Sequence, residues 1–271
     1  MRGMRMLLSS LLIGAFSVPV SAVAQEKVRL PWHPGWTSQF DDANTGGELV
    51  AKLFRPVHAP KAPFVVFMHG CGGLQLERVS HWAKFFSQRG VGFLMVDSFS
   101  TRNVKSECDN PPLEWIKRRA DDAASALAWL TMQPYVKSDR VAIMGQSQGG
   151  AALLFALSGE AGTTNAFVAG LAMYPACIRA LNNNLSLSKP VLVLIGSEDT
   201  LTPPADCERL QARQPDKGKL DLIVYPGAAH EFDNPVKSFL FLGKYRDGED
   251  PTSRAKAQAR VAQWIEMVLK Q

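Results

Sequence analysis

The stretch VAIMGQSQGGAALLFAL, residues 141–157, decides the fold. It opens with an apolar run of strand length, Val141–Met144, and from Ala151 it has the alanine and leucine content of a helix. Between the two lies GQSQG, residues 145–149, a serine with a glycine two residues away on each side. A strand-to-helix turn this sharp needs glycines there, because a Cβ would clash, and the strained serine backbone lifts the hydroxyl clear of the sheet. The segment therefore predicts an elbow that presents Ser147 as a nucleophile; the alternative is a serine that only caps the helix.

Similar apolar runs recur along the chain and alternate with longer amphipathic stretches. We predict strands over Leu49–Phe54, Phe64–Met68, Gly92–Val96, Val141–Met144, Phe167–Met173, Val191–Ile195 and Leu220–Tyr225. Most of these runs are continuous rather than alternating, as expected for strands covered on both faces. One unbroken series of strand and helix units predicts an α/β fold, with a mostly parallel central sheet and helices on both faces. Residues 25–271 are expected to form this single domain, with its site at the carboxyl ends of the strands.

Two long helices are predicted from their spacing. The first runs from Leu113 to Leu130 and carries one apolar stripe, and the second covers roughly Pro251 to Lys270. In the first helix, four charged residues fall largely off the apolar stripe: Arg118, Arg119, Asp121 and Asp122. This pattern is typical of the polar face of an amphipathic helix.

The N-terminus has the layout of a secretory signal peptide. Arg2 and Arg5 precede an apolar run from Met6 to Val20, and Ala22-Val23-Ala24 supplies the small residues of a cleavage site. We predict that residues 1–24 are removed by cleavage after Ala24, which would place the protein in the periplasm or outside the cell without a stable membrane anchor. The alternative is that the segment is retained as an N-terminal anchor.

Composition limits the partners. The chain has 271 residues, 46% of them hydrophobic and 20% charged, and a formal charge of +5 that falls to +3 when two arginines leave with the signal peptide. No basic run stands out, which argues against a nucleic-acid binder. The four cysteines of an exported chain suggest disulfides, but they allow three pairings, and their spacing matches no zinc site. No metal and no organic cofactor is expected.

A serine nucleophile needs a base and an acid that orients the base, and in an elbow fold both come later in the chain. In VLVLIGSEDTLTPPADC, residues 191–207, Asp199 follows a buried strand; Glu198 competes for the role, but the loop pattern favours Asp199. In LIVYPGAAHEFDNP, residues 222–235, His230 follows the last strand and is the only histidine downstream of Ser147. We therefore predict a triad of Ser147, Asp199 and His230.

The tetrahedral intermediate also needs hydrogen-bond donors. One candidate is the backbone N–H of Gln148, and the other is the backbone N–H of Cys71, in the strand-end loop FVVFMHGCGGL, residues 64–74. His69 is expected to hold this loop by hydrogen bonds rather than to act in catalysis. Cys71 is a poor candidate nucleophile, since it precedes the elbow and has no downstream orienting acid of its own.

Four segments together carry a family resemblance: MHGCGGL, DRVAIMGQSQGG, VLVLIGSEDTLTP and YPGAAHEFD. With them the chain resembles the dienelactone hydrolase family of α/β-hydrolases, over roughly Gly47 to Lys270. The resemblance implies an α/β-hydrolase fold with Ser147 as nucleophile, Asp199 as acid and His230 as base. The enzymes that gave the family its name have cysteine at the elbow, so serine here favours a general serine esterase over a dedicated lactone hydrolase.

The resemblance also suggests further assignments. Family members tend to bind acidic substrates through arginines, and Arg102 is the candidate here, with an ordinary loop arginine as the alternative. From their positions after strand ends, we predict the disulfide Cys177–Cys207 and, second, Cys71–Cys108.

The sequence thus predicts an exported serine hydrolase that cleaves a small-molecule carboxylic ester or lactone through an acyl-enzyme on Ser147. One alternative is an amidase or oligopeptidase with the same triad. Another is a catalytically silent exported binding protein.

Overall fold

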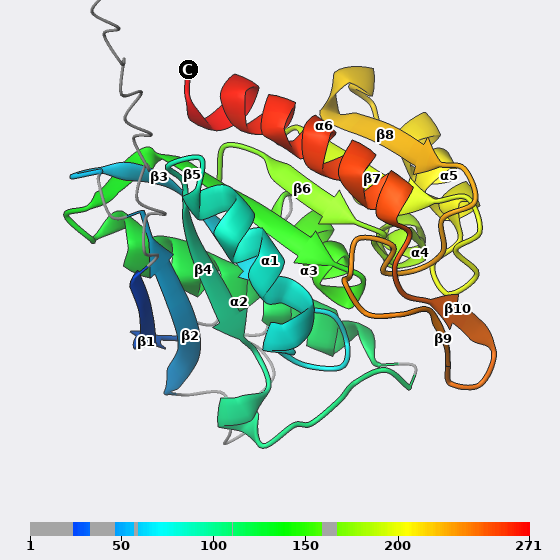
Figure 1. Cartoon of the computed structure of the whole chain (residues 1–271), viewed down its shortest axis with the longest axis horizontal. Helices are drawn as coiled ribbons and strands as arrows, with labels where there is room; N and C mark the ends of the chain where they lie inside the picture. Colours follow the sequence, from blue (N-terminus) through cyan, green and yellow to red (C-terminus); the bar gives the residue numbers. More distant parts are fainter. Residues whose placement is uncertain (1–23, 33–46, 57–58, 110, 159–166) are drawn as a thin grey trace, which may run out of the picture.

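Eight strands form one sheet in the order β1-β2-β4-β3-β5-β6-β7-β8 (Figure 1). The computed structural model describes residues 24–32, 47–56, 59–109, 111–158 and 167–271. The strands are β1 Ala24–Pro31, β2 Glu48–Arg55, β3 Ala62–Met68, β4 Gly92–Asp97, β5 Val136–Gln146, β6 Gly170–Met173, β7 Val191–Gly196 and β8 Leu220–Tyr225. All neighbouring pairs are parallel except those of β2 with β1 and with β4. The predicted α/β-hydrolase fold with a mostly parallel sheet is confirmed.

Each of the seven predicted strands occurs in the sheet. The strands β3, β4, β6 and β7 and the second half of β5, from Val141 on, are buried almost throughout, which explains why their sequences read as continuous apolar runs. β6 begins at Gly170, later than predicted, although the Val168 N–H already donates to the Val141 carbonyl at 2.9 Å. Strand β1 was not predicted; it lies at the sheet edge with only one face on the core.

The helices cover the sheet on both faces. α1 and α6 lie on the near face in Figure 1, and α2 and α3 lie behind it, packed against each other and against the central strands. The helices are α1 Leu76–Ser87, α2 Leu113–Thr131, α3 Gln148–Ala156, α4 Cys177–Asn182, α5 Pro204–Arg213 and α6 Pro251–Leu269, with short 3-10 turns at Ser100–Arg102 and Lys217–Lys219. Among the described residues, none of the helices is long and apolar enough to cross a membrane.

One expectation about α2 is wrong. Arg119, Asp121 and Asp122 are fully buried, although they fall largely off the apolar stripe. Asp122 accepts two hydrogen bonds from Arg102, at 2.7 and 2.9 Å. Arg119 donates to the side-chain oxygen of Gln148 and to the backbone carbonyl of His69. Arg119 and Asp122 therefore lie inside the protein, where the Arg102 guanidinium satisfies Asp122 and neutral acceptors satisfy Arg119.

Two further features frame the site. A two-stranded hairpin of β9, Phe239–Phe241, and β10, Tyr245–Asp247, follows β8 and precedes α6 in the chain and is drawn in orange in Figure 1. Both predicted disulfides, Cys71–Cys108 and Cys177–Cys207, are present.

The predicted signal peptide lies outside the described residues except for Ala24, the first residue of β1, and stays a prediction.

Candidate active site

The elbow between β5 and α3 holds Ser147 in a strained conformation. Its φ is 53° and its ψ is −118°, a region that residues other than glycine rarely adopt. Close backbone contacts explain the flanking glycines. A Cβ on Gly145 would lie 2.2 Å from the carbonyl oxygen of Gly149, and a Cβ on Gly149 would lie 2.2 Å from that of Met68. The two glycines therefore allow the sharp turn that carries Ser147 at the carboxyl edge of the sheet.

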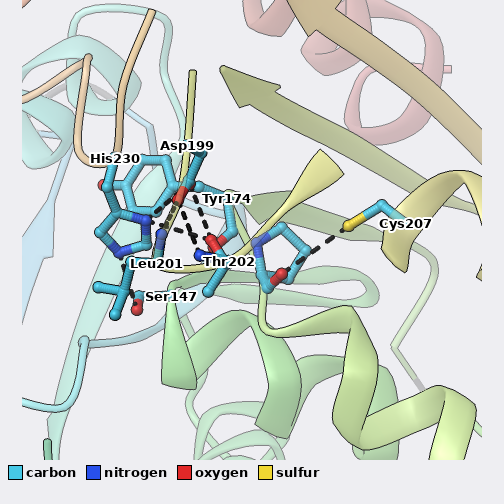
Figure 2. Close-up of polar contacts among 8 residues, drawn as sticks. Ser147, Tyr174, Asp199, Leu201, Thr202, Cys207 and His230 are labelled. Atoms are coloured by element: carbon cyan, nitrogen blue, oxygen red, sulfur yellow. Dashed lines mark hydrogen bonds and ion pairs between the residues drawn. The ribbon is translucent and has the colours of Figure 1, made fainter. Parts of the chain in front are cut away.

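The imidazole of His230 lies between Ser147 and Asp199 (Figure 2). Its Nε2 is 3.0 Å from Ser147 Oγ, and its Nδ1 is 2.7 Å from Asp199 Oδ2. The other carboxylate oxygen, Oδ1, accepts the backbone N–H groups of Leu201 and Thr202 at 3.0 and 2.8 Å. The Thr202 hydroxyl lies 2.8 Å from Asp199 Oδ2. These contacts hold Asp199 toward the ring, so the structure brings together the three residues predicted from sequence.

The surroundings of His230 set its protonation. Burial lowers the pKa of His230, but the adjacent Asp199 carboxylate, and more weakly Glu231 and Asp247, outweigh burial and raise it above the ordinary value. An imidazole with a raised pKa is a stronger base toward a serine proton. The arrangement can therefore deprotonate Ser147 and stabilise the imidazolium that forms.

One predicted oxyanion donor belongs to the elbow, and the other lies in the loop after β3. Gln148 is the first residue of α3, and Cys71 follows Gly70 in the loop after β3. A Cβ on Gly70 would lie 3.8 Å from the Cβ of Ser147, so this loop runs directly beside the serine. Within the described part of the chain, neither N–H donates a hydrogen bond. Both are available for a ligand oxygen, and their catalytic role stays a prediction.

A buried arginine fixes both donor segments. Arg119 of α2 donates to the side-chain oxygen of Gln148 and to the backbone carbonyl of His69, two residues before Cys71. Burial lowers the pKa of Arg119 to about 9, and the neighbouring Asp122 opposes that shift. One guanidinium thus connects the elbow with the loop after β3. The sequence interpretation of α2 missed this residue.

His69 holds the loop, as the sequence indicates. Its Nε2 accepts the Ser98 N–H at 3.2 Å, so the proton is on Nδ1, which donates to the Gly70 carbonyl at 2.7 Å. Burial and the nearby Arg119 charge lower the pKa of His69 well below its ordinary value. The ring is therefore neutral and structural.

The Cys71–Cys108 disulfide adds a covalent link to the same region. The N–H of Glu107 donates to the carbonyl of Cys71 at 2.9 Å, and the side-chain nitrogen of Gln148 donates to the carbonyl of Glu107 at 3.0 Å. The segment that carries Cys108 therefore contacts both predicted donor residues.

Asp233 links the elbow to the loop that follows β8 and carries His230, which we call the histidine loop. Fully buried, it accepts hydrogen bonds from the Trp82 indole at 2.6 Å and from the Gln146 amide at 2.9 Å. Burial raises the pKa of Asp233, but the His81 and Trp82 groups around it outweigh burial and hold the pKa below the ordinary value. Because Gln146 precedes Ser147 and Asp233 follows His230 by three residues, this contact helps to fix His230 relative to Ser147.

Arg102 is paired with a buried carboxylate. Its terminal nitrogens bond both oxygens of the buried Asp122, and its guanidinium lies 5.6 Å from the ring centre of Trp32. It does not line the pocket beside Ser147. The Arg102 guanidinium thus pairs with a carboxylate inside the protein, and its role in substrate binding stays a prediction.

A pocket opens beside the serine, with a volume of about 590 Å³ that includes space open to solvent. It is bounded by the loop after β3, by α1, by the histidine loop and by the β9–β10 hairpin. Its lining residues include Cys71, Arg78, Ser147, His230, Glu231, Asn234, Phe241 and Asp247. Across the described residues, no group of three or more His, Cys, Asp or Glu side chains could hold a metal ion.

Comparison with known proteins identifies relatives. A sequence model of the dienelactone hydrolase family matches residues 49–269. A curated protein of Mycobacterium tuberculosis named as a putative phosphoribosyl transferase is 28% identical over 179 residues, which are 65% of this chain and 38% of that protein. The chain thus matches well under half of this relative's length.

Solved structures agree with the fold. The dienelactone hydrolase of Anabaena variabilis superposes with a TM-score of 0.64 at 19% identity, over 91% of this chain and 99% of that chain. A puromycin-hydrolyzing peptidase of Mycobacterium tuberculosis has the same TM-score and identity, over 93% of this chain and 40% of that chain. At these identities the likeness shows the fold.

Proposed function

The chain belongs to the dienelactone hydrolase family, and we propose that it hydrolyses carboxylic esters through an acyl-enzyme on Ser147. Family membership and the hydrolase neighbours support a serine hydrolase. The ester reaction and the residue roles are our proposal. The observation that carries it is the His230 ring, which lies within hydrogen-bond distance of both Ser147 Oγ and Asp199 Oδ2.

In the first half of the reaction, Ser147 Oγ attacks the ester carbonyl while His230 Nε2 accepts the hydroxyl proton. Asp199 keeps the Nδ1–H tautomer in place and stabilises the imidazolium. The N–H groups of Gln148 and Cys71 donate to the oxyanion of the tetrahedral intermediate. His230 then protonates the leaving alcohol, and the acyl group stays on Ser147.

In the second half, water replaces the alcohol. His230 accepts a proton from the water, which attacks the acyl carbonyl, and the same two N–H groups stabilise the second oxyanion. Collapse of that intermediate releases the acid and returns the proton to Ser147. No step requires a group that this chain's residues and water do not supply.

A covalent probe tests the nucleophile. We expect a fluorophosphonate to label the folded protein at Ser147, and Ser147→Ala to abolish labelling and lower kcat on an ester panel by several orders of magnitude. Ser138→Ala is the matched control, since Ser138 is an exposed serine of the same strand, β5, at its other end. Near-normal turnover by Ser147→Ala would remove Ser147 from the mechanism.

Cleavage of amides is the second candidate. The likeness to a puromycin-hydrolyzing peptidase favours it, because the same triad can attack either carbonyl. Rates on ester and amide substrates that differ only in the scissile bond separate the two. A comparable kcat/KM on the amide would support an amidase or oligopeptidase, whereas lack of Ser147 labelling would favour a silent binding protein.

We also propose that the protein is exported. The two disulfides support an oxidising compartment, where such bonds form and persist. Mass spectrometry of the N-terminus after expression with its leader tests cleavage after Ala24. An intact leader on membrane-associated protein would support the retained anchor.

A further inference from the structure

The pocket beside Ser147 has an unusual balance of charge. Among the described residues that line it, the acidic and basic side chains besides His230 are Arg78, Glu231 and Asp247. Arg78 donates to Glu231 at 2.7 Å, and Glu231 also accepts from the Asn234 amide at 2.7 Å. The positive charge is thus already paired, and one carboxylate is left over.

That carboxylate, Asp247, is buried but incompletely bonded. It is the last residue of β10 and is only 2% exposed, yet its Oδ1 has no hydrogen-bond partner among the residues that the structure describes. The backbone fixes its position, because residue 247 bridges to His230 and the Gly248 N–H donates to the His230 carbonyl at 3.0 Å. A buried carboxylate oxygen without a donor is costly, and a ligand that supplies one removes the cost.

We propose that Asp247 binds a hydrogen-bond donor on the substrate, a hydroxyl or an ammonium group, while the ester carbonyl of the same molecule reaches Ser147. The substrate class is therefore an ester that carries such a donor, and an anionic ester is disfavoured. This inference rests on the proposed ester hydrolysis and adds its specificity. It contrasts with the binding of acidic substrates through arginines that the family resemblance implies.

Charge near Asp247 supports this assignment. Burial, and then the nearby Glu231 carboxylate, raise the pKa of Asp247 to about 7, against the opposing effects of His230, Arg78 and the Gly248 amide. An ammonium group on the substrate would favour the ionised form of Asp247. A carboxylate on the substrate would instead be repelled by Asp247 and Glu231. The pocket therefore discriminates by the sign of the substrate charge.

The test uses the full-length enzyme and four aryl esters of equal acyl length that end in methyl, hydroxyl, ammonium or carboxylate. We expect kcat/KM for the hydroxyl or ammonium ester to exceed that for the methyl ester by at least about tenfold, the usual effect of a hydrogen bond to a charged group. The carboxylate ester should be the slowest. A flat series, or preference for the carboxylate ester, would overturn the inference.

Two variants separate charge from hydrogen bonding. Asp247→Asn keeps the size and one acceptor oxygen, so it should lose the ammonium preference and keep the hydroxyl preference. Asp247→Ala should lose both the ammonium and the hydroxyl preference. Each preference is measured as the ratio of kcat/KM for two esters in the same variant. Asp139→Asn is the matched control, since Asp139 is exposed on β5 and pairs with its neighbour Arg140. If Asp247→Ala fails to fold, Asp247→Asn decides the question alone, and an unchanged ammonium preference in that variant would refute the assignment.

The pH dependence adds a readout that a structural role for Asp247 would not produce. Four groups act on this carboxyl. Glu231 and His230 come from the histidine loop, the Gly248 amide follows Asp247 in the chain, and Arg78 comes from α1. Because Asp247 ionises as the pH rises, the ratio of kcat/KM for the ammonium ester over the methyl ester should increase through about pH 7. A ratio independent of pH would count against a charged contact.

Failure of this inference differs from failure of the proposed function. If the methyl ester is hydrolysed in a Ser147-dependent reaction without a preference for donor groups, the esterase proposal stands and the inference is wrong. If none of the four esters is turned over, the proposed function fails and the inference fails with it.

Discussion

Removal of the Cys71–Cys108 disulfide should lower both stability and catalysis. The bond spans 37 residues, and the chain-entropy relation assigns it about 3.5–4 kcal/mol of stability. It also ties the segment of Glu107 to the residue whose N–H we assign to the oxyanion hole. We expect Cys71→Ser with Cys108→Ser to lower kcat by at least about tenfold, and by less than the ~10²–10³-fold cost of deleting an oxyanion donor.

The chain supplies its own control. Cys177–Cys207 spans 30 residues, so its removal should cost nearly the same free energy, yet Cys207 lies away from Ser147 (Figure 2). The assay is urea unfolding together with kcat and KM on a neutral ester, at a temperature where both double variants are folded. Equal losses of kcat in the two variants, or an unchanged kcat without Cys71–Cys108, would refute the role of this disulfide in positioning the donor.

Three other outcomes test the rest of the site. Gly149→Ala should not fold, or should lose at least about 4 kcal/mol in thermal unfolding, because its Cβ would meet the Met68 carbonyl oxygen at 2.2 Å. The pKa of His230 is raised and the neutral ring is the active form, so kcat/KM should fall as the pH drops through a value above about 6.5. Asp199→Asn should shift this fall in kcat/KM to lower pH, because the variant loses the carboxylate that raises the pKa of His230. If the fall stays at the same pH, a group other than His230 causes it. Thr202→Val should lower kcat by about tenfold, since one hydrogen bond to a charged group is lost while two backbone donors remain; wild-type kcat would show that the hydroxyl is dispensable.

Much of the fold was predictable because its central strands are buried on both faces. Such strands need apolar residues at every position, and the runs at Phe64–Met68 and Val191–Ile195 show this directly. Strand β1 escaped prediction because only one of its faces is buried. The hairpin of β9 and β10 escaped because each strand has three residues, too few for a pattern.

The candidate triad was predictable because its chemistry requires particular residue types in a fixed chain order. The supporting polar groups were not. Arg119 is a charged residue in a helix, and only the hydrogen bonds it makes across the fold explain its burial. Asp247 has no sequence signal, since its position depends on how the chain returns after the histidine loop. Thr202 had a weak signal, as a threonine three residues after a candidate acid favours a local turn.

The attachment of the β9–β10 hairpin to the backbone of His230 has a practical consequence for engineering. The segment that would shape substrate preference also holds His230, our proposed general base, so swapping the whole hairpin between relatives should disturb turnover as well as selectivity. Libraries that keep Asp247 and Gly248 and randomise the turn residues, 242–244, should yield more active clones than libraries that replace the hairpin entirely.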